Sequence, residues 1–248
     1  MELMSRPRPL RHVWAMTAAA LCLVPVSACA GDTTTDPSTT QAPTRSTTTG
    51  GKDMQEEIAT TLEATSPTIA RAVRADTTSI SPIEAAALGD WQVVDVLPSG
   101  GGHPQRWFMG IKDSGREVVV LSGFPERWEQ VIEGARVTSA DEAEELAAVH
   151  ADATRDMTKG YARLSSVDDI RFVPTPSEEE TARIEAVRRD HADDISAATV
   201  TGDGPWIVEL WTVTDGDLVR HDVTVGTDGA ITDATEVVEA DLPVPETV

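Results

Sequence analysis

The chain of 248 residues carries 20 Lys and Arg side chains against 42 Asp and Glu side chains, which gives a formal net charge of −22. Nucleic acids and anionic lipid surfaces are bound through Lys and Arg, so this balance excludes nucleic acid as a partner and adhesion to a membrane through a basic surface. The hydrophobic content of 40% is sufficient for a packed core, so the chain is not wholly disordered.

The amino terminus has the pattern of an export signal. Three arginines, at positions 6, 8 and 11, precede an uncharged apolar run over residues 13–25. A run of this length is typical of a signal peptide and too short to cross about 30 Å of hydrocarbon comfortably. We therefore predict a signal peptide over residues 1–28.

The end of this segment, Val26-Ser27-Ala28-Cys29, resembles the lipobox of bacterial lipoprotein precursors. The resemblance covers only the amino terminus, and the alternative is an ordinary secretory signal with a cysteine near its cleavage site. The lipobox resemblance implies cleavage between Ala28 and Cys29, with acyl chains attached to Cys29 as a membrane anchor. Cys22 would be lost with the signal, leaving no disulfide. The resemblance thus implies a lipid-anchored protein on the outer face of the cytoplasmic membrane.

A threonine-rich segment follows the lipobox. Residues 31–51 contain nine threonines, two prolines and no apolar side chain larger than Ala, so they cannot offset the entropy cost of ordering by burial. We predict a lipidated Cys29 and a disordered tether over residues 29–51. A flexible chain of this length has a typical end-to-end distance of about 25 Å.

Beyond Lys52 the sequence becomes periodic. We predict an amino-terminal helix-plus-meander half over 52–136 and a carboxyl-terminal half over 137–245, and the two halves can also form one domain. Hydrophobic spacing and capping residues predict helices over 53–62, 69–73, 82–88, 125–133, 139–157 and 177–195. Alternation and turn residues predict strands over 91–97, 106–112, 116–122, 161–165, 170–173, 206–213, 218–225 and 230–238.

This order of elements predicts an α+β fold in which helices pack on one face of antiparallel meander sheets. The pattern is loosely similar to cystatin-like or NTF2-like architectures. The repetition of helices followed by three strands also suggests an internal duplication.

Two histidines on predicted helices share the same local motif, His150-Ala151-Asp152 and His191-Ala192-Asp193. Each histidine is at helical spacing from apolar residues, so both can face inward. Facing histidines beside Asp152 and Asp193 could act as acid and base or bind zinc. The simpler interpretation places each histidine at the edge of the core. Because HExxH, GxSxG and CxxC motifs are absent from the sequence, we predict neither a metal site nor a cofactor.

Trp206 and Trp211 lie on opposite faces of the predicted strand 206–213, and both faces are apolar apart from Glu209. The strand is therefore expected to be covered on each side. The alternative is that the two tryptophans line an apolar pocket or a partner surface.

These features favour a non-enzymatic, lipid-anchored module that binds an envelope protein or a small ligand. One alternative is a hydrolase that uses His150 and His191 with the neighbouring Asp152 and Asp193. Another is a carrier with an apolar cavity for lipid. Convergent histidines and aspartates would favour the enzyme, and a large apolar cavity would favour the carrier.

Overall fold

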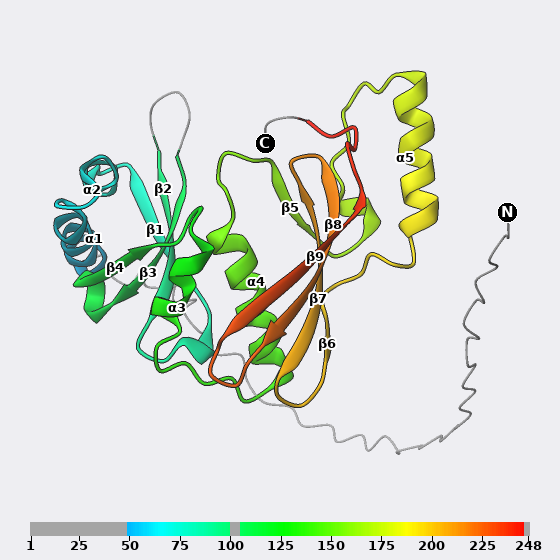
Figure 1. Cartoon of the computed structure of the whole chain (residues 1–248). Helices are drawn as coiled ribbons and strands as arrows, with labels where there is room; N and C mark the ends of the chain where they lie inside the picture. Colours follow the sequence, from blue (N-terminus) through cyan, green and yellow to red (C-terminus); the bar gives the residue numbers. More distant parts are fainter. Residues whose placement is uncertain (1–48, 100–104, 246–248) are drawn as a thin grey trace, which may run out of the picture. The chain divides into compact units, whose positions relative to one another are not determined.

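The computed structural model describes residues 49–99 and 105–245 (Figure 1). The predicted signal peptide, the lipobox-like sequence with Cys29 and most of the predicted tether lie outside the described residues. The described part contains two antiparallel sheets and five α-helices, so the predicted α+β class is confirmed. The likeness to cystatin or NTF2 architectures stays a prediction.

Sheet A is a four-stranded antiparallel meander in the order β1-β2-β3-β4. Its strands are β1 (Thr78–Ile83), β2 (Gln92–Pro98), β3 (Trp107–Lys112) and β4 (Glu117–Val120). Strands β2, β3 and β4 confirm the predictions of strands over 91–97, 106–112 and 116–122. The turn between β3 and β4 contains Ser114 with φ of 58° and Gly115 with φ of 102°, a left-handed region that glycine adopts readily.

Helices α1 (Thr49–Leu62) and α2 (Pro67–Arg74) cover one face of sheet A. The side-chain amide of Gln55 ties the two helices together by donating to the carbonyl oxygen of Val73 at 2.6 Å. The buried cluster under the helices combines residues of both helices and of three strands, namely Ile58, Ala59, Leu62, Ala70, Val73, Val94, Val96, Met109, Ile111 and Val120.

The predicted helix beginning at Ser81-Pro82 is wrong, because these residues belong to β1. Ile80 lies opposite Val96, and Pro82 lies opposite Val94. Proline lacks a backbone N–H and is tolerated in edge strands, and β1 is an edge of sheet A. Only a short 3₁₀ turn, η1 (Ala86–Leu88), follows before Gly89.

Helix α4 (Ala140–Thr154) contacts the second face of sheet A and also sheet B. Its N-cap is Ser139, whose hydroxyl accepts a hydrogen bond from the backbone of Glu142 at 3.2 Å. The largest hydrophobic cluster joins α4 and the short helix α3 (Trp128–Val131) to buried residues of both sheets, including Val93, Phe108, Trp128, Val131, Leu146, Ala147, Trp206, Val208, Leu210 and Val223. Residues from both predicted halves therefore share this cluster.

Sheet B has five strands, in the order β5-β7-β8-β9 with β6 also paired to β7. The strands are β5 (Tyr161–Leu164), β6 (Thr199–Thr201), β7 (Trp206–Thr214), β8 (Asp217–Val225) and β9 (Ile231–Glu239). Strands β7, β8 and β9 form the antiparallel meander predicted over 206–238. The β7–β8 turn at Asp215-Gly216 has positive φ at both residues, 55° and 87°, as expected for a tight hairpin.

Helix α5 (Glu178–His191) packs against the face of sheet B opposite to α4. It begins with a complete capping box, in which the Ser177 hydroxyl and the Glu180 carboxylate each accept from the other residue's backbone N–H. As alternation predicts, Trp206 is buried in the α4 cluster and Trp211 in the α5 cluster. The Trp206 face of β7 is thus covered, whereas the Trp211 face is covered at Trp211 and Val213 and open at Ile207, whose side chain is 48% exposed.

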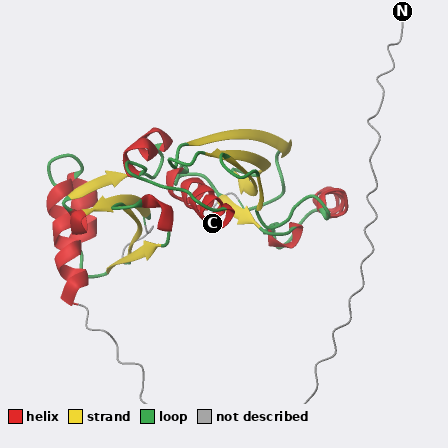
Figure 2. Cartoon of the chain, turned by 90° about the horizontal axis from the view of Figure 1, so that it is seen from below, coloured by secondary structure: helices red, strands yellow, loops and turns green. Residues whose placement is uncertain are grey.

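Besides the segment at Ser81-Pro82, the arrangement departs from the predictions in three further places. Residues 170–173 form no strand; Ile170 is buried and Val173 donates to the carbonyl oxygen of Pro243 at 2.9 Å. Strand β6 is absent from the predictions. Helical segments lie on both faces of each sheet rather than on one (Figure 2). The internal duplication stays a prediction, and the sheets differ in connectivity, because α5 is inserted between β5 and β6.

Within residues 49–99 and 105–245, no helix is both long enough and apolar enough to cross a membrane.

Candidate functional site

His150 is a core-edge residue of α4. Its imidazole meets the Trp128 ring edge-on, with ring centroids 5.2 Å apart. Burial lowers the pKa of His150 to about 4; the Asp233 charge has a smaller, opposing effect, and His221 adds to the lowering. The imidazole is therefore neutral at neutral pH.

His191 lies at the end of α5, beside acidic groups. Its Nε2 is 3.4 Å from Oε1 of Glu239, and its Nδ1 is 3.7 Å from Oδ2 of Asp194. Asp193, the acidic partner expected from sequence, is exposed. Helices α4 and α5 pack on opposite faces of sheet B, so the structure does not bring His150 and His191 together in one site, the alternative to the core-edge interpretation.

A third histidine, not singled out by the sequence, lies in a polar line on sheet B. His221 Nδ1 is 2.8 Å from Oδ2 of Asp233, and His221 Nε2 is 3.0 Å from Oγ1 of Thr212. These connections match those of a catalytic triad, in which a carboxylate orients an imidazole base and the imidazole activates a hydroxyl nucleophile. The Thr212 side chain has no exposed surface, so this hydroxyl is closed to a substrate. The line satisfies polar groups across three neighbouring strands, β7, β8 and β9.

Alternation along β8 could have identified His221. Val219, Val223 and Val225 are buried, and the period of two places His221 on the same face. A polar side chain at an inward position needs a hydrogen-bonding partner, and the register brings His221 beside β7 and β9.

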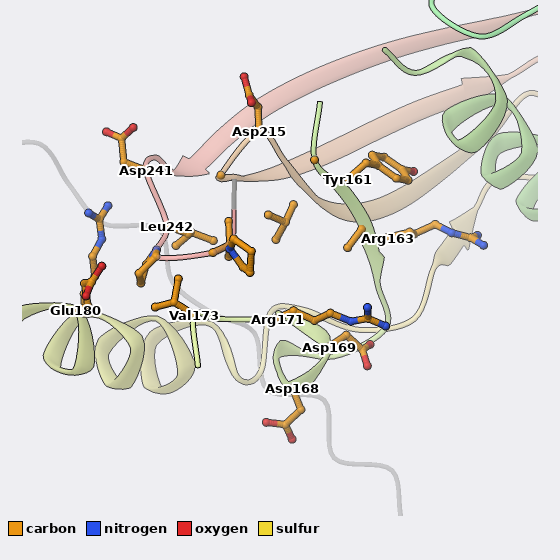
Figure 3. A pocket seen from close by; sticks show the side chains of 18 of the residues that line it. Tyr161, Arg163, Asp168, Asp169, Arg171, Val173, Glu180, Asp215, Asp241 and Leu242 are labelled. Carbon is orange, nitrogen blue, oxygen red and sulfur yellow. The ribbon is translucent and has the colours of Figure 1, made fainter. Parts of the chain in front are cut away.

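A wide cleft of about 1640 Å³ lies between β5, the start of α5, the β7–β8 turn and the carboxyl-terminal segment (Figure 3). Val173 and Leu242 lie in its middle, and Asp168, Asp215 and Asp241 are on its rim. Two of its carboxylates already accept hydrogen bonds from backbone N–H groups. Asp169 accepts from Ser165 and Ser166, and Glu180 accepts from Ser177.

Figure 3 also shows that Tyr161 and Arg163 extend from β5 to the side away from Val173 and Leu242. This direction agrees with the strand register, which pairs Tyr161 with Thr214 and Arg163 with Thr212. Both side chains therefore project toward α4, on the face of sheet B where Thr212 and Leu210 lie.

There they line a second, smaller cavity, which we call the arginine pocket. It has a volume of about 480 Å³ and lies where β1, β3, α4, β5 and β7 meet. Its lining consists of apolar residues and three arginines with their polar neighbours: Ile83, Arg106, Phe108, Glu144, Val149, Asp152, Arg155, Tyr161, Ala162, Arg163, Leu164, Ser165, Ala197, Ala198 and Leu210.

The first arginine is held in place by a bidentate ion pair. Arg106 donates to both carboxylate oxygens of Asp95, each at 2.7 Å. The hydrogen bonds to Asp95 raise the pKa of Arg106. The guanidinium also lies over the Phe108 ring, 4.8 Å from its centroid. Strands β2 and β3 thus fix this group by a paired charge and an aromatic contact.

The second arginine shares a carboxylate with a tyrosine. The Tyr161 hydroxyl donates to Oδ1 of Asp152 at 2.8 Å, and Arg163 Nη2 lies 3.4 Å from Oδ2 of the same carboxylate. Burial and the nearby Asp152 charge raise the pKa of Tyr161 well above its ordinary value, so the hydroxyl stays protonated. Asp152, a residue that the sequence analysis selected, is therefore engaged by β5 rather than by His150.

The third arginine, Arg155, caps the carboxyl terminus of α4. Its Nε donates to the backbone oxygen of Asp152 at 3.2 Å, and its guanidinium lies over Tyr161, 4.5 Å from the ring centroid. Burial lowers the pKa of Arg155. Among the described residues, Arg155 forms no ion pair and its Nη atoms have no hydrogen-bonding partner. Its charge is thus partly desolvated, and the Asp152 and Asp95 carboxylates act on it without forming an ion pair.

The polar groups of this pocket are suited to hydrogen bonding. They comprise three guanidinium groups, a protonated phenol, the paired Asp152 carboxylate and Glu144, whose carboxylate forms no hydrogen bond or ion pair with another described residue. In the described part of the chain, no group of three or more His, Cys, Asp or Glu side chains is arranged to hold a metal ion. Sequence reasoning missed the three arginines because they are at positions 106, 155 and 163, on three separate elements.

Comparisons with protein-family models, with curated proteins and with solved structures found no match for this chain.

Proposed function

We propose that the chain is a lipid-anchored, non-enzymatic binding module that holds a small ligand on the outer face of the cytoplasmic membrane. The observation that carries the binding role is Arg155, a half-buried guanidinium that lines a defined pocket with Nη donors unused by the described residues. The anchoring role depends on the lipobox-like sequence ending at Cys29.

The hydrolase alternative has less support. It requires His150 and His191 to cooperate with Asp152 and Asp193, and these residues belong to separate environments. The Thr212–His221–Asp233 line has suitable connections, but its hydroxyl is buried.

The carrier alternative also has less support. A lipid carrier needs a continuous apolar cavity, and both the arginine pocket and the wide cleft carry charged side chains among their lining residues. The apolar residues of the described part are largely collected in three closed clusters instead.

The anchor is tested by Cys29→Ser in the full chain, expressed in bacteria supplied with an alkyne-labelled fatty acid. The unchanged chain should incorporate the label and fractionate with membranes, while the variant should remain unlabelled and either accumulate as precursor or leave the membrane fraction. The matched control is Cys22→Ser, which changes the other cysteine and should keep the label. Equal labelling of both variants would contradict the anchor.

The binding role is tested by native mass spectrometry of the full-length protein extracted from bacterial membranes. We expect a population with an additional small-molecule mass that is lost on denaturation. A protein that carries no additional mass from its native membrane, and gains none when incubated with a metabolite extract of the same cells, would contradict the binding module.

A further inference from the structure

We propose that the arginine pocket binds a small organic molecule through its carboxylate or phosphate group, and that Arg155 is the principal residue that binds this group. This inference rests on the binding module proposed above and specifies the chemical class of its ligand.

The first argument comes from the orientation of the Arg155 donors. A guanidinium that stacks on an aromatic ring uses its face, and its N–H donors remain in the plane of the group. For Arg155 the face is taken by Tyr161, and Nε is taken by the backbone oxygen of Asp152. The Nη edge is left for a planar or tetrahedral oxyanion, which a guanidinium can bind in bidentate fashion.

The second argument is that the nearby carboxylates are already engaged. Asp95 is bound by Arg106 through two hydrogen bonds, and Asp152 is bound by Tyr161 and Arg163. Glu144 also lines the pocket, and among the described residues it forms no ion pair with any of the three arginines. Asp152 and Asp95 act on Arg155 only at longer range. Among the described residues, Arg155 is therefore the one guanidinium of the three that has no ion-pair partner.

The third argument concerns the energetic effect of an anion. A charge removed from water without a partner is unfavourable, and a bound anion would compensate it. Burial is the largest influence on the pKa of Arg155 and outweighs the opposing effect of the Asp152 and Asp95 charges. The remaining chain has a large acidic excess, so a pocket with three arginines is an unusual local environment in this protein.

The shape and lining of the pocket specify the rest of the ligand. A volume of about 480 Å³ lies within the range of small-molecule sites, roughly 300–1,000 Å³. The lining also includes the apolar residues Ile83, Phe108, Val149 and Leu210. We therefore infer a molecule with one oxyanion group and an aromatic or branched aliphatic body.

The test is isothermal titration calorimetry on the full-length protein in a non-ionic detergent at constant ionic strength. The probes are phenyl phosphate, benzoate and benzamide, which share a ring and differ in the charged group. At least one of the two anions should bind, about tenfold or more tighter than neutral benzamide, since charge-assisted hydrogen bonds are the stronger kind. Failure of both anions to bind, or equal binding of benzamide, would overturn the proposal.

Variants assign the binding to Arg155. Arg155→Met should weaken binding of the anion by about tenfold or more. Arg127→Met is the matched control, because Arg127 also stacks on a ring, Phe124, and also donates to a backbone oxygen, that of Val120, but lies outside the pocket. Arg155→Lys keeps the charge without the planar fork and should give intermediate affinity. Unchanged affinity in a folded Arg155→Met or Arg155→Lys variant would overturn the assignment.

The two proposals fail in different ways. A neutral natural ligand found by native mass spectrometry, or one retained by Arg155→Met, would refute the anionic class and leave the binding module intact. A protein that carries no ligand from the cell but binds phenyl phosphate in the calorimeter would refute the cellular role and leave the chemistry of the pocket intact.

Discussion

Protonation of His150 should destabilise the folded protein as the pH falls. The pKa of a histidine in an unfolded chain is about 6.5, whereas burial beside Trp128 lowers the pKa of His150 to about 4. Between these values the unfolded state holds more protons than the folded state. The stabilisation is therefore complete above pH 6.5 and is lost progressively toward pH 4.

The size of the effect follows from the two pKa values. A fully expressed difference between 6.5 and about 4 corresponds to about 3 kcal/mol, and about 2 kcal/mol is already lost at pH 5. Urea unfolding at pH 7 and at pH 5 measures this loss in the free energy of unfolding. His150→Gln removes the titrating group, so the variant should lose about 2 kcal/mol less than the unchanged protein over this interval. An identical pH dependence of both proteins would refute the reasoning.

Three further predictions concern packing, capping and the pocket. In Gly110→Ala the new Cβ would lie 2.5 Å from Cγ2 of buried Val131, so thermal unfolding should show that the free energy of unfolding falls by about 1–3 kcal/mol. Adding Val131→Ala should restore part of this loss, and additive losses in the double variant would contradict the contact. Ser177→Ala removes the N-cap of α5 and should cost about 1 kcal/mol; hydrogen exchange should become faster in α5, and unchanged protection there would argue against the cap. Tyr161→Phe removes the hydroxyl bound to Asp152 and should cost about 1–2 kcal/mol in urea unfolding, and an unchanged midpoint would mean that this bond adds no stability.

Much of the fold could be predicted because local signals agree with tertiary packing. Alternation identified β7, β8 and β9, and Ser177 with Glu180 marked the start of α5. The faces of β7 were also predictable, because Trp206 and Trp211 differ by an odd number of positions. In each case the residues that decide the structure are close together in the sequence.

The errors arise where the tertiary environment overrides the local signal. Ser81-Pro82 has the composition of a helix start, yet pairing with β2 makes it an edge strand. Residues 170–173 have apolar residues typical of a strand, but Val173 bonds to the distant Pro243 instead of to a neighbouring strand. Neither outcome is encoded in a short window of sequence.

The candidate site was the least predictable part. The sequence analysis selected His150 and His191 as candidates, together with Asp152 and Asp193, because the two histidines share a motif. Of these four residues, only Asp152 lines the arginine pocket. Arg106 precedes β3, Arg155 follows α4 and Arg163 is in β5, so only the packing of both sheets around α4 brings them together. Their chemistry depends on which carboxylates are already paired, and pairing is a property of the folded chain.

The central claim is that Arg155 holds an oxyanion through its Nη donors, and NMR of the arginine side chains in the full-length, ¹⁵N-labelled protein tests it most directly. Phenyl phosphate added to the protein should shift the Arg155 guanidinium resonances in a saturable manner, with Arg127 unchanged as the internal reference. A titration that leaves the Arg155 resonances in place, or that shifts those of Arg155 and Arg127 alike, would contradict the claim.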